Sequence, residues 1–497
     1  MTVERISHWI GGKVAPGESG ITGPVYNPAT GEQTHEVDFA SVEEFDRAVE
    51  VAKEAFPEWR ALSLSKRAAL FFRMREILDQ RKTDISKAVT SQHGKCLFDA
   101  ASEVERGVEL LEFAAGLPHL LKGNFSEQVT TGYDLYSVRQ PLGVVAGITP
   151  FNFPAMVPMW MCAAAMAAGN CFILKPSEKD SGASLLLAEA FHDAGLPDGV
   201  FQVVQGDKLI VDRILEHPDV KAVSFVGSTP VAKYIYATGA ANGKRVQALA
   251  GAKNHMIVLP DADVGMAADA AVSSVNGSAG ERCMAIATVV PVGDIAEPLI
   301  EAILERTARL RVGDGMDPEN EMGPLVTREH RDRVVSYLDV AREEGAEVLV
   351  DGREHPLWGT GFFVGPSVID HVTEDMTCYK DEIFGPVGTI VRVPTYEDAI
   401  ALTHRNPWGN GAAIFTRDGG AARQFVFDIE AGMVGINVPI PVPLAFYSFG
   451  GWKDSLFGDS KMYGSEGFHF WTREKAVTVR WPDPATSKVD LGFPDAR

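Results

Sequence analysis

Strand-like and helix-like stretches alternate between residues 142 and 250, and this alternation constrains the fold more than any other feature of the sequence. Short apolar runs such as GVVAGITP, CFILKP and KAVSFVG are separated by longer runs with helical spacing, such as GASLLLAEAFHDAG. Repeated strand–helix–strand units form parallel strands that are joined by right-handed crossovers. The alternation therefore predicts a doubly wound parallel sheet with helices on both faces.

A second alternating series starts at Asn254. The strand-like NHMIVLP is followed by the helix-like DVGMAADAAVSSVNG, and the strand-like MAIATVVPV comes directly after Cys283. At 497 residues the chain is long enough for two or three domains, each with its own apolar core. We therefore expect a second α/β domain.

Two further segments predict irregular or projecting structure. Residues 120 to 141 mix polar and β-branched side chains without helical period, which is typical of a hairpin, and the late strand-like KAVTVRW can pair with it. Residues 432 to 451 are rich in proline and glycine and predict a loop that crosses between the domains.

Composition excludes several classes of protein. A formal charge of −21 disfavours nucleic-acid binding, which needs a basic field. The longest apolar run, residues 153 to 169, is short for a membrane span and carries two prolines, so a buried helix is expected. The N-terminus MTVERISHWIGGKV lacks the basic start and apolar block of a secretory signal, so we expect a cytoplasmic protein without a membrane partner.

The cysteines predict chemistry rather than cross-links. They are odd in number and scattered, without a CxxC pair or a histidine pair at metal spacing, so we expect reduced thiols and no metal. Cys283 differs from the others because small residues precede it and Arg282 adjoins it; a thiol attacks as thiolate and needs such positive potential. These residues leave both a nucleophile and a buried thiol open. His255 begins a strand and favours a core or capping role over that of a base.

Two loops after strands of the first series can contact a nucleotide. A helix that opens at Thr229 after FVGS, residues 225 to 228, offers free amides to a phosphate, and the lysine and carboxylate of KPSE, residues 175 to 178, can bind ribose hydroxyls. An ordinary glycine turn and an exposed lysine explain each loop equally well. Two such loops at one sheet edge favour a dinucleotide.

The motifs GERCMA, TPFNFP, LKPSE, FVGS and DEIFGP occur in the order and approximate spacing of the aldehyde dehydrogenase superfamily, which the sequence resembles over nearly its whole length. The resemblance implies two doubly wound α/β domains plus a small β oligomerisation element. It assigns residues 1–122 and 142–250 to an NAD-binding domain, 251–431 to a catalytic domain, 432–475 to a return segment with an interdomain loop, and 123–141 and 476–490 to oligomerisation strands.

The resemblance also implies roles for individual residues. Cys283 takes the place of the nucleophile, and Asn152 that of the oxyanion donor, which is typically worth about 3 to 4 kcal/mol. Glu178, placed against the adenine ribose, favours NAD over NADP because a carboxylate repels a 2′-phosphate. The cofactor-binding positions implied are Thr149, Phe151, Lys175, Glu178, Lys179, Phe225, Gly227, Ser228, Ala250, Glu382 and Phe384.

One departure from the family pattern bears on the reaction. Hydrolytic members carry ELGGK, whose glutamate activates water, whereas this chain has ALAGAK with Ala248 in place of that base. Losing a general base typically removes a factor of about 10² to 10⁴, so the thioester on Cys283 should persist until a thiol such as coenzyme A attacks it. The alternatives are that Glu281 supplies a base or that the chain is an inactive relative.

GERCMA, GAKNH and GINVPIPVP together resemble the CoA-acylating methylmalonate-semialdehyde dehydrogenases of that superfamily. This implies NAD- and CoA-dependent oxidation of methylmalonate or malonate semialdehyde to propionyl-CoA or acetyl-CoA with decarboxylation, by a homodimer or homotetramer. Arg282 and Arg106 match the branch's carboxylate-binding arginines, although Arg106 can equally pair with Glu109. The rival functions are a hydrolytic semialdehyde dehydrogenase that releases free acid and a catalytically silent nucleotide-binding relative.

Overall fold

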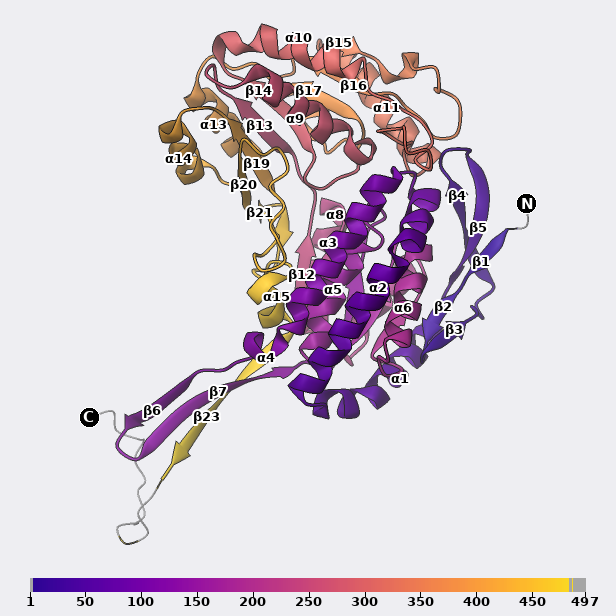
Figure 1. Cartoon of the computed structure of the whole chain (residues 1–497), viewed down its shortest axis with the longest axis vertical. Coiled ribbons are helices and arrows are strands. Elements are labelled where there is room, and N and C mark those ends of the chain that lie inside the picture. The colour runs from indigo at the N-terminus through magenta and orange to yellow at the C-terminus, as the bar shows by residue number, and fades with distance from the viewer. Residues whose placement is uncertain (1–2, 482–484, 486–497) are drawn as a thin grey trace.

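The computed structural model describes residues 3–481 and 485. It contains two large sheets, each covered by helices, and a projecting β arm (Figure 1). Each sheet together with its helices is called a layer below. The first layer is built on an eight-stranded sheet whose five central strands are parallel. In spatial order its strands are β22 (Leu456–Phe457), β12 (Arg245–Leu249), β11 (Val220–Val226), β8 (Val144–Ile148), β9 (Cys171–Lys175), β10 (Phe201–Val203), β2 (His8–Ile10) and β3 (Lys13–Ala15).

Strands β8, β9 and β10 are buried along their whole length, and β11 and β12 are buried except near their starts, because helices cover the sheet on both faces. The parallel, doubly wound sheet predicted from the alternating pattern is thus present. Its antiparallel edges, β2, β3 and β22, come from the two ends of the chain. The helices of this layer are α1 (Val42–Ala61), α2 (Leu64–His93), α3 (Leu97–Ala115), α5 (Met156–Ala167), α6 (Gly182–Asp193), α7 (Lys208–Glu216) and α8 (Thr229–Ala241).

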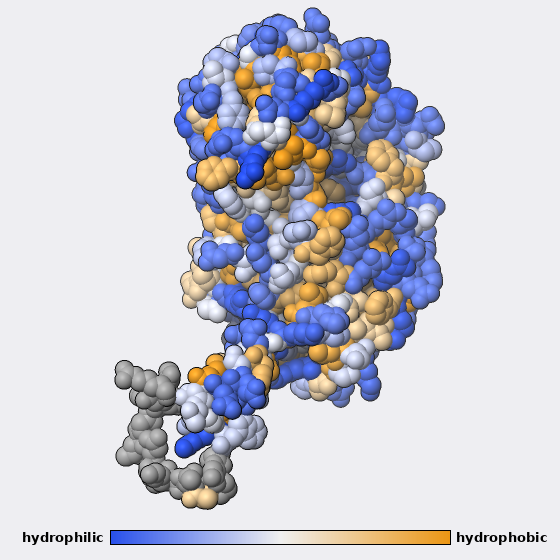
Figure 2. Space-filling view, turned by 60° about the vertical axis from the view of Figure 1, so that its left-hand side comes forward, coloured by the Kyte–Doolittle hydropathy of each residue, from blue (hydrophilic) through white to orange (hydrophobic). Residues whose placement is uncertain are grey.

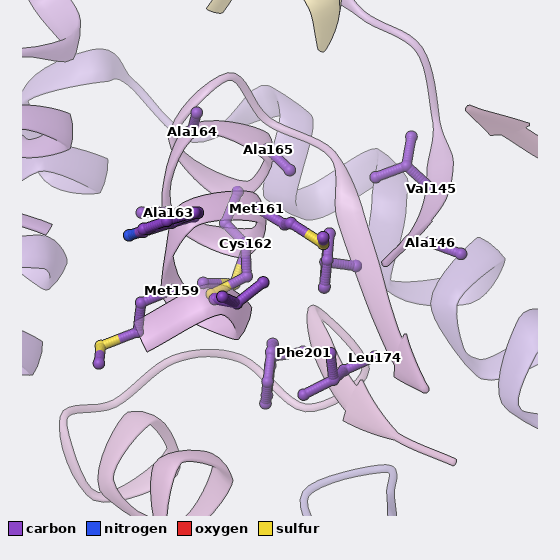
Figure 3. Packing of buried hydrophobic residues seen from close by; sticks show 14 of the residues in the cluster. Val145, Ala146, Met159, Met161, Cys162, Ala163, Ala164, Ala165, Leu174 and Phe201 are labelled. Carbon is purple, nitrogen blue, oxygen red and sulfur yellow. The ribbon is translucent and has the colours of Figure 1, made fainter. Parts of the chain in front are cut away.

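The apolar run 153–169 forms α5, and every residue of this helix is buried. Met159, Met161 and Cys162 pack in one cluster with Leu174 of β9 and Phe201 of β10 (Figure 3). The expected buried helix is confirmed. In the described part of the chain we find no helix with the length and apolarity that crossing a membrane requires.

The second layer contains a seven-stranded sheet that is parallel except for β15. Separate apolar clusters lie on its two faces. The strands in spatial order are β15 (Glu347–Val350), β16 (Ser367–Asp370), β17 (Val387–Ile390), β14 (Ile286–Pro291), β13 (Asn254–Val258), β19 (Gly411–Phe415) and β20 (Met433–Ile436). The helices are α9 (Val264–Asn276), α10 (Ala296–Thr307), α11 (Arg328–Glu343), α13 (Tyr396–Arg405) and α14 (Gly419–Asp428).

The arm is a three-stranded sheet that extends away from the body (Figures 1 and 2). It consists of β6 (Phe125–Thr130), β7 (Tyr133–Pro141) and β23 (Thr472–Arg480), and β23 pairs with β7 from Thr472 to Arg480. Most of the predicted segment 476–490, namely residues 482–484 and 486–490, lies outside the described residues. The proline- and glycine-rich interval 432–451 is irregular only from residue 437 onward, because Met433–Ile436 forms β20 at the edge of the second sheet; no strand or helix lies between β20 and β21 (Trp452–Lys453).

A smaller sheet near the N-terminus was not anticipated in detail. It consists of β1 (Glu4–Ile6), β5 (Glu32–Phe39) and β4 (Ile21–Asn27) and encloses a small apolar cluster of its own.

Candidate active site

Cys283 lies on the short segment between α9 and β14, where the two layers meet, and it packs against the apolar cluster of the first layer. The turn that leads to it is left-handed: Ser278, Ala279 and Gly280 have φ values of 54°, 51° and 76°. Non-glycine residues in this region each cost about 1 to 3 kcal/mol and occur mainly at functional sites. A Cβ atom on Gly280 would lie 2.1 Å from the carbonyl oxygen of Gly385, so this turn packs directly against the DEIFGP loop.

The backbone of Cys283 is held by two amide side chains. Its carbonyl accepts hydrogen bonds from Asn254 Nδ2 at 2.9 Å and from Asn410 Nδ2 at 3.0 Å. Asn152 Nδ2 lies 3.5 Å from the Cys283 sulfur and donates at 2.9 Å to the carbonyl of Glu281. An amide donor therefore points at the atom where covalent chemistry would begin.

Burial raises the pKa of the Cys283 thiol to about 11, although the Asn152 amide acts in the opposite direction. The other four thiols, Cys96, Cys162, Cys171 and Cys378, are buried, and burial raises their pKa values as well. Cys283 is thus the one partly exposed cysteine of the five. Exposure and the adjacent amide distinguish it from the packing thiols.

Arg282, which the sequence offers as a source of positive potential near the thiol, has a carboxylate partner. Its guanidinium pairs with the buried Asp99 of α3 at 2.8 Å. The cation whose charge lowers the pKa of the Cys283 thiol is Lys95, which acts against the larger effect of burial. Arg282 and Cys283 nevertheless line one small cavity together.

Arg106 has partners that explain its place on α3. It forms an ion pair with Glu109 at 2.7 Å and donates at 2.9 Å to the carbonyl of Pro443 in the interdomain loop. The i,i+3 pair that the sequence left open is therefore present. A contact between Arg106 and a substrate stays a prediction.

An open cavity of about 680 Å³ adjoins Cys283 and the carboxyl ends of β8, β11 and β12. It brings together most of the residues that the motifs single out, although these are far apart in the chain. Those that line it are Phe151, Asn152, Lys179, Gly227, Ser228, Ala250, Cys283, Glu382 and Phe384.

Four other predicted cofactor positions lie outside this lining. Lys175 pairs with Glu178 at 3.2 Å, and although burial raises the pKa of Glu178, the lysine charge makes the net change a lowering. Thr149 Oγ1 is buried and has no hydrogen-bond partner among the described residues. Phe225 is buried in β11, one residue before the lining begins at Val226.

Sequence reasoning missed two side chains of the cavity, His330 and Arg333 of α11. His330 lies edge-on to Phe151 and within 2.7 Å of the carbonyl oxygen of Phe384. Neither residue belongs to a motif quoted above, and α11 follows Cys283 only after a long intervening segment. A position on an amphipathic helix was the only signal, and it does not distinguish them from surface residues.

Glu382 is the only carboxylic acid among the lining residues. Its Oε1 accepts a hydrogen bond from the amide of Ala252 at 3.0 Å, and burial raises its pKa to about 7. Ala248 lies inside β12, fully buried, and does not line the cavity; Ala250 and Gly251 do. Alanine and glycine have no basic side chain, so Ala248, Ala250 and Gly251 cannot supply a base.

The two other candidate bases face elsewhere. The Glu281 carboxylate accepts from the amide of Val326 and lies near His93 and His330, outside the lining of the cavity. Burial raises its pKa well above the usual range. His255 is a core residue, as expected, in contact with the hydroxyl of Tyr379 at 2.9 Å.

The fold is that of an α/β protein built on two helix-covered sheets, and a partly exposed cysteine with an amide donor beside it lies where the two layers meet. The sequence model of the aldehyde dehydrogenase family matches residues 15–477. The chain belongs to this family, which confirms the resemblance found in the motifs and the predicted fold class.

Individual relatives cover nearly the whole chain. A malonate-semialdehyde dehydrogenase of Pseudomonas aeruginosa is 50% identical over 98% of this chain and 99% of the relative. A methylmalonate-semialdehyde dehydrogenase of Oceanimonas doudoroffii has a TM-score of 0.96 and 50% identity, over 97% of this chain and 99% of that one. A Sinorhizobium meliloti structure in complex with NAD has a TM-score of 0.96 and 49% identity, over 98% and 100% of the two chains.

Proposed function

We propose that the protein oxidises malonate semialdehyde and methylmalonate semialdehyde with NAD and coenzyme A, releasing acetyl-CoA and propionyl-CoA with loss of the substrate carboxylate. The names of the similar proteins support the substrate class. The observation that carries the acylating reaction is the lack of a free carboxylate among the residues that line the cavity beside Cys283. Ala248 is buried in β12, and Glu382, the one carboxylic acid in the lining, is assigned here to the cofactor.

The residues around the cavity fit NAD. Helix α8 begins after Ser228, whose side chain does not cap it, so its first amides are available to a phosphate. The half-exposed Glu178 beside Lys175 suits the adenine ribose, and Glu382 suits the ribose next to the nicotinamide. When bound, NAD accepts the hydride that the substrate loses on oxidation.

The chain's own residues act on the carbonyl carbon. The Cys283 sulfur forms a bond to this carbon, and Asn152 Nδ2 donates a hydrogen bond to the oxygen that becomes negatively charged. Oxidation leaves a thioester on Cys283. Because no water-activating carboxylate replaces the missing family glutamate, hydrolysis is slow, and the thiolate of coenzyme A displaces the cysteine sulfur.

Recognition of the substrate carboxylate falls to Arg282 and Arg106. A guanidinium has five N–H donors, and each arginine retains donors beyond those that bind Asp99 or Glu109. Arg282 is the better placed of the two because it lines a cavity with Cys283. Its carboxylate partner Asp99 holds it there.

A product assay with and without coenzyme A tests the proposal. With coenzyme A, we expect continuous NADH formation and acetyl-CoA or propionyl-CoA as product. Without it, we expect one NADH per active site and then turnover slower by about 10² to 10⁴. Equal turnover without coenzyme A would identify a hydrolytic dehydrogenase. NADH formation that stays at the background level in both the wild-type protein and Cys283→Ala would identify a silent relative.

The same assay tests the arginines when propanal is the control substrate. Arg282→Leu and Arg106→Leu should raise KM for malonate semialdehyde and leave that for propanal almost unchanged, because propanal has no carboxylate. Equal losses on both substrates would assign the arginines to the structure of the site.

We further propose a cytoplasmic homodimer or homotetramer. All five cysteines are unpaired, as is usual in a reducing compartment. The arm exposes apolar side chains on both of its faces, including Phe125 at 65% and Leu135 at 37%, and an exposed sheet of this kind can pair with or pack on another chain.

A further inference from the structure

Lys95 is a buried cation that the mechanism above does not use. It follows Gly94, whose left-handed backbone, with φ 99°, ends α2 and turns the chain into the interior. Its Nζ donates to Glu103 Oε2 at 2.7 Å and to the carbonyl of Asn152 at 2.5 Å. It also lies 4.1 Å from the centre of the Phe153 ring. The ammonium is therefore bound to Glu103 and to the loop that carries Asn152.

Glu103 holds the same loop at its other end. Its Oε1 accepts hydrogen bonds from the amides of Ala155 and Met156 at 2.8 Å and 3.1 Å. These amides begin α5, which has no capping side chain of its own, so a carboxylate is favourable there. Together, Lys95 and Glu103 therefore hold the loop at the carbonyl of Asn152 and at the two amides where α5 begins.

Stability alone is a weak reason for such a pair. Both side chains are fully buried, and a buried ion pair often stabilises a fold no better than apolar side chains of the same volume. What distinguishes this pair is its location. It contacts the residue that points at the Cys283 sulfur, whereas the neighbouring Arg282 is turned to Asp99.

We propose that the Lys95–Glu103 pair is a positioning device of the active site: it fixes the loop so that Asn152 reaches the Cys283 sulfur. The lysine charge acts in the same direction, because it favours the ionised thiol. The proposal rests on the proposed roles of Cys283 and Asn152. It does not depend on which aldehyde is oxidised or on coenzyme A.

The test measures alkylation of Cys283 by iodoacetamide, in which the thiolate displaces iodide, across pH in the full-length protein. Peptide mass spectrometry distinguishes Cys283 from the buried cysteines. The variants are Lys95→Met and the double variant Lys95→Met/Glu103→Gln, in which the Gln oxygen still accepts the two amides and no unpaired charge is buried. The matched control is Lys244→Met, because Lys244 is also buried and donates to the carbonyls of His217 and Val220, at the amino ends of β11 and β12, whereas the cavity adjoins their carboxyl ends.

We expect both Lys95 variants to move the alkylation midpoint to higher pH and to lower kcat about tenfold at neutral pH, with the dissociation constant for NAD unchanged. Lys244→Met should lower the unfolding temperature without moving the midpoint. If Lys95→Met does not fold, the double variant carries the test. A wild-type midpoint and kcat in the double variant, or an equal shift in Lys244→Met, overturns the proposal. Because alkylation needs no substrate, it separates this outcome from failure of the proposed function.

Discussion

Burial and spatial position, more than residue type, decide how the charged residues around Cys283 act on one another. Arg282 is the nearest cation in sequence but pairs with Asp99, whereas Lys95 is remote in sequence and lowers the pKa of the thiol against the effect of burial. Glu382 is a carboxylic acid whose pKa is raised to about 7 because burial penalises its charged form. Its charge therefore changes within the working pH range of an ordinary enzyme.

This pKa predicts a pH dependence of cofactor binding. The carboxylate form of Glu382 accepts hydrogen bonds from ribose hydroxyls, and it forms as the pH rises through about 7. We expect the dissociation constant for NAD to fall about tenfold between pH 6 and pH 8, as measured by tryptophan fluorescence. Glu382→Gln, which does not ionise, should flatten the curve. A flat curve for the wild-type protein would show that another group controls binding.

Among the elements of the fold, the turn between α9 and β14 contributes most to the site. Three successive left-handed residues reverse the chain so that Cys283 faces the cavity, and Gly280 packs against Gly385 with no room for a side chain. The turn and the DEIFGP loop, which also carries Glu382, are therefore positioned by each other.

Gly280→Ala tests this contact, with Gly243→Ala as the control. Both glycines have similar φ values, 76° and 71°, but Gly243 has open space around it. Each alanine should cost about 1 to 2 kcal/mol of unfolding free energy through its left-handed backbone, and Gly280→Ala should cost more than Gly243→Ala because its Cβ also clashes with the backbone of Gly385. Only Gly280→Ala should also lower kcat, by up to about 10²-fold, because it displaces Cys283. Equal kcat in the two variants, with thermal unfolding as the measure of stability, would show that the contact is not needed.

At the scale of the whole molecule, the arm is the part that the body of the protein does not explain. It extends from the first layer and is built from segments near residues 130 and 475, and it carries exposed apolar residues such as Phe125 and Val129. Assembly with a second copy would cover them, which is why we connect the arm with the proposed oligomer.

Phe125→Glu on the arm should shift the mass measured by light scattering toward the monomer, because a charge on an apolar contact surface opposes association. The control is Phe72→Glu on α2, where the side chain is 61% exposed, close to the 65% of Phe125. Loss of assembly in both variants, or in neither, would argue against the arm as the contact.

Features that depend on residues close together in the chain could be predicted from the sequence, whereas features that depend on residues far apart could not. Hydrophobic periodicity is local, so the alternating strands and helices, the two α/β layers, the buried helix α5 and the pairing of the late strand with the hairpin could all be anticipated. Motif spacing pointed in the same way to Cys283, Asn152 and Glu382. The edge strands β2, β3 and β22 could not be anticipated, because short strands at sheet edges carry little periodicity.

Charge pairing and exposure depend on distances between segments that are far apart in the chain. For that reason the sequence pointed to Arg282 as the cation beside the thiol, and it contained no signal for Lys95, for His330 and Arg333 in the cavity, or for the orientation of Glu281. In the folded chain Arg282 forms an ion pair with Asp99, and Lys95 donates a hydrogen bond to the carbonyl of Asn152. The pattern of residues thus determined the fold class and pointed to the candidate nucleophile, and packing decided which charges lie near it, because a Coulomb interaction depends on separation in space and on burial.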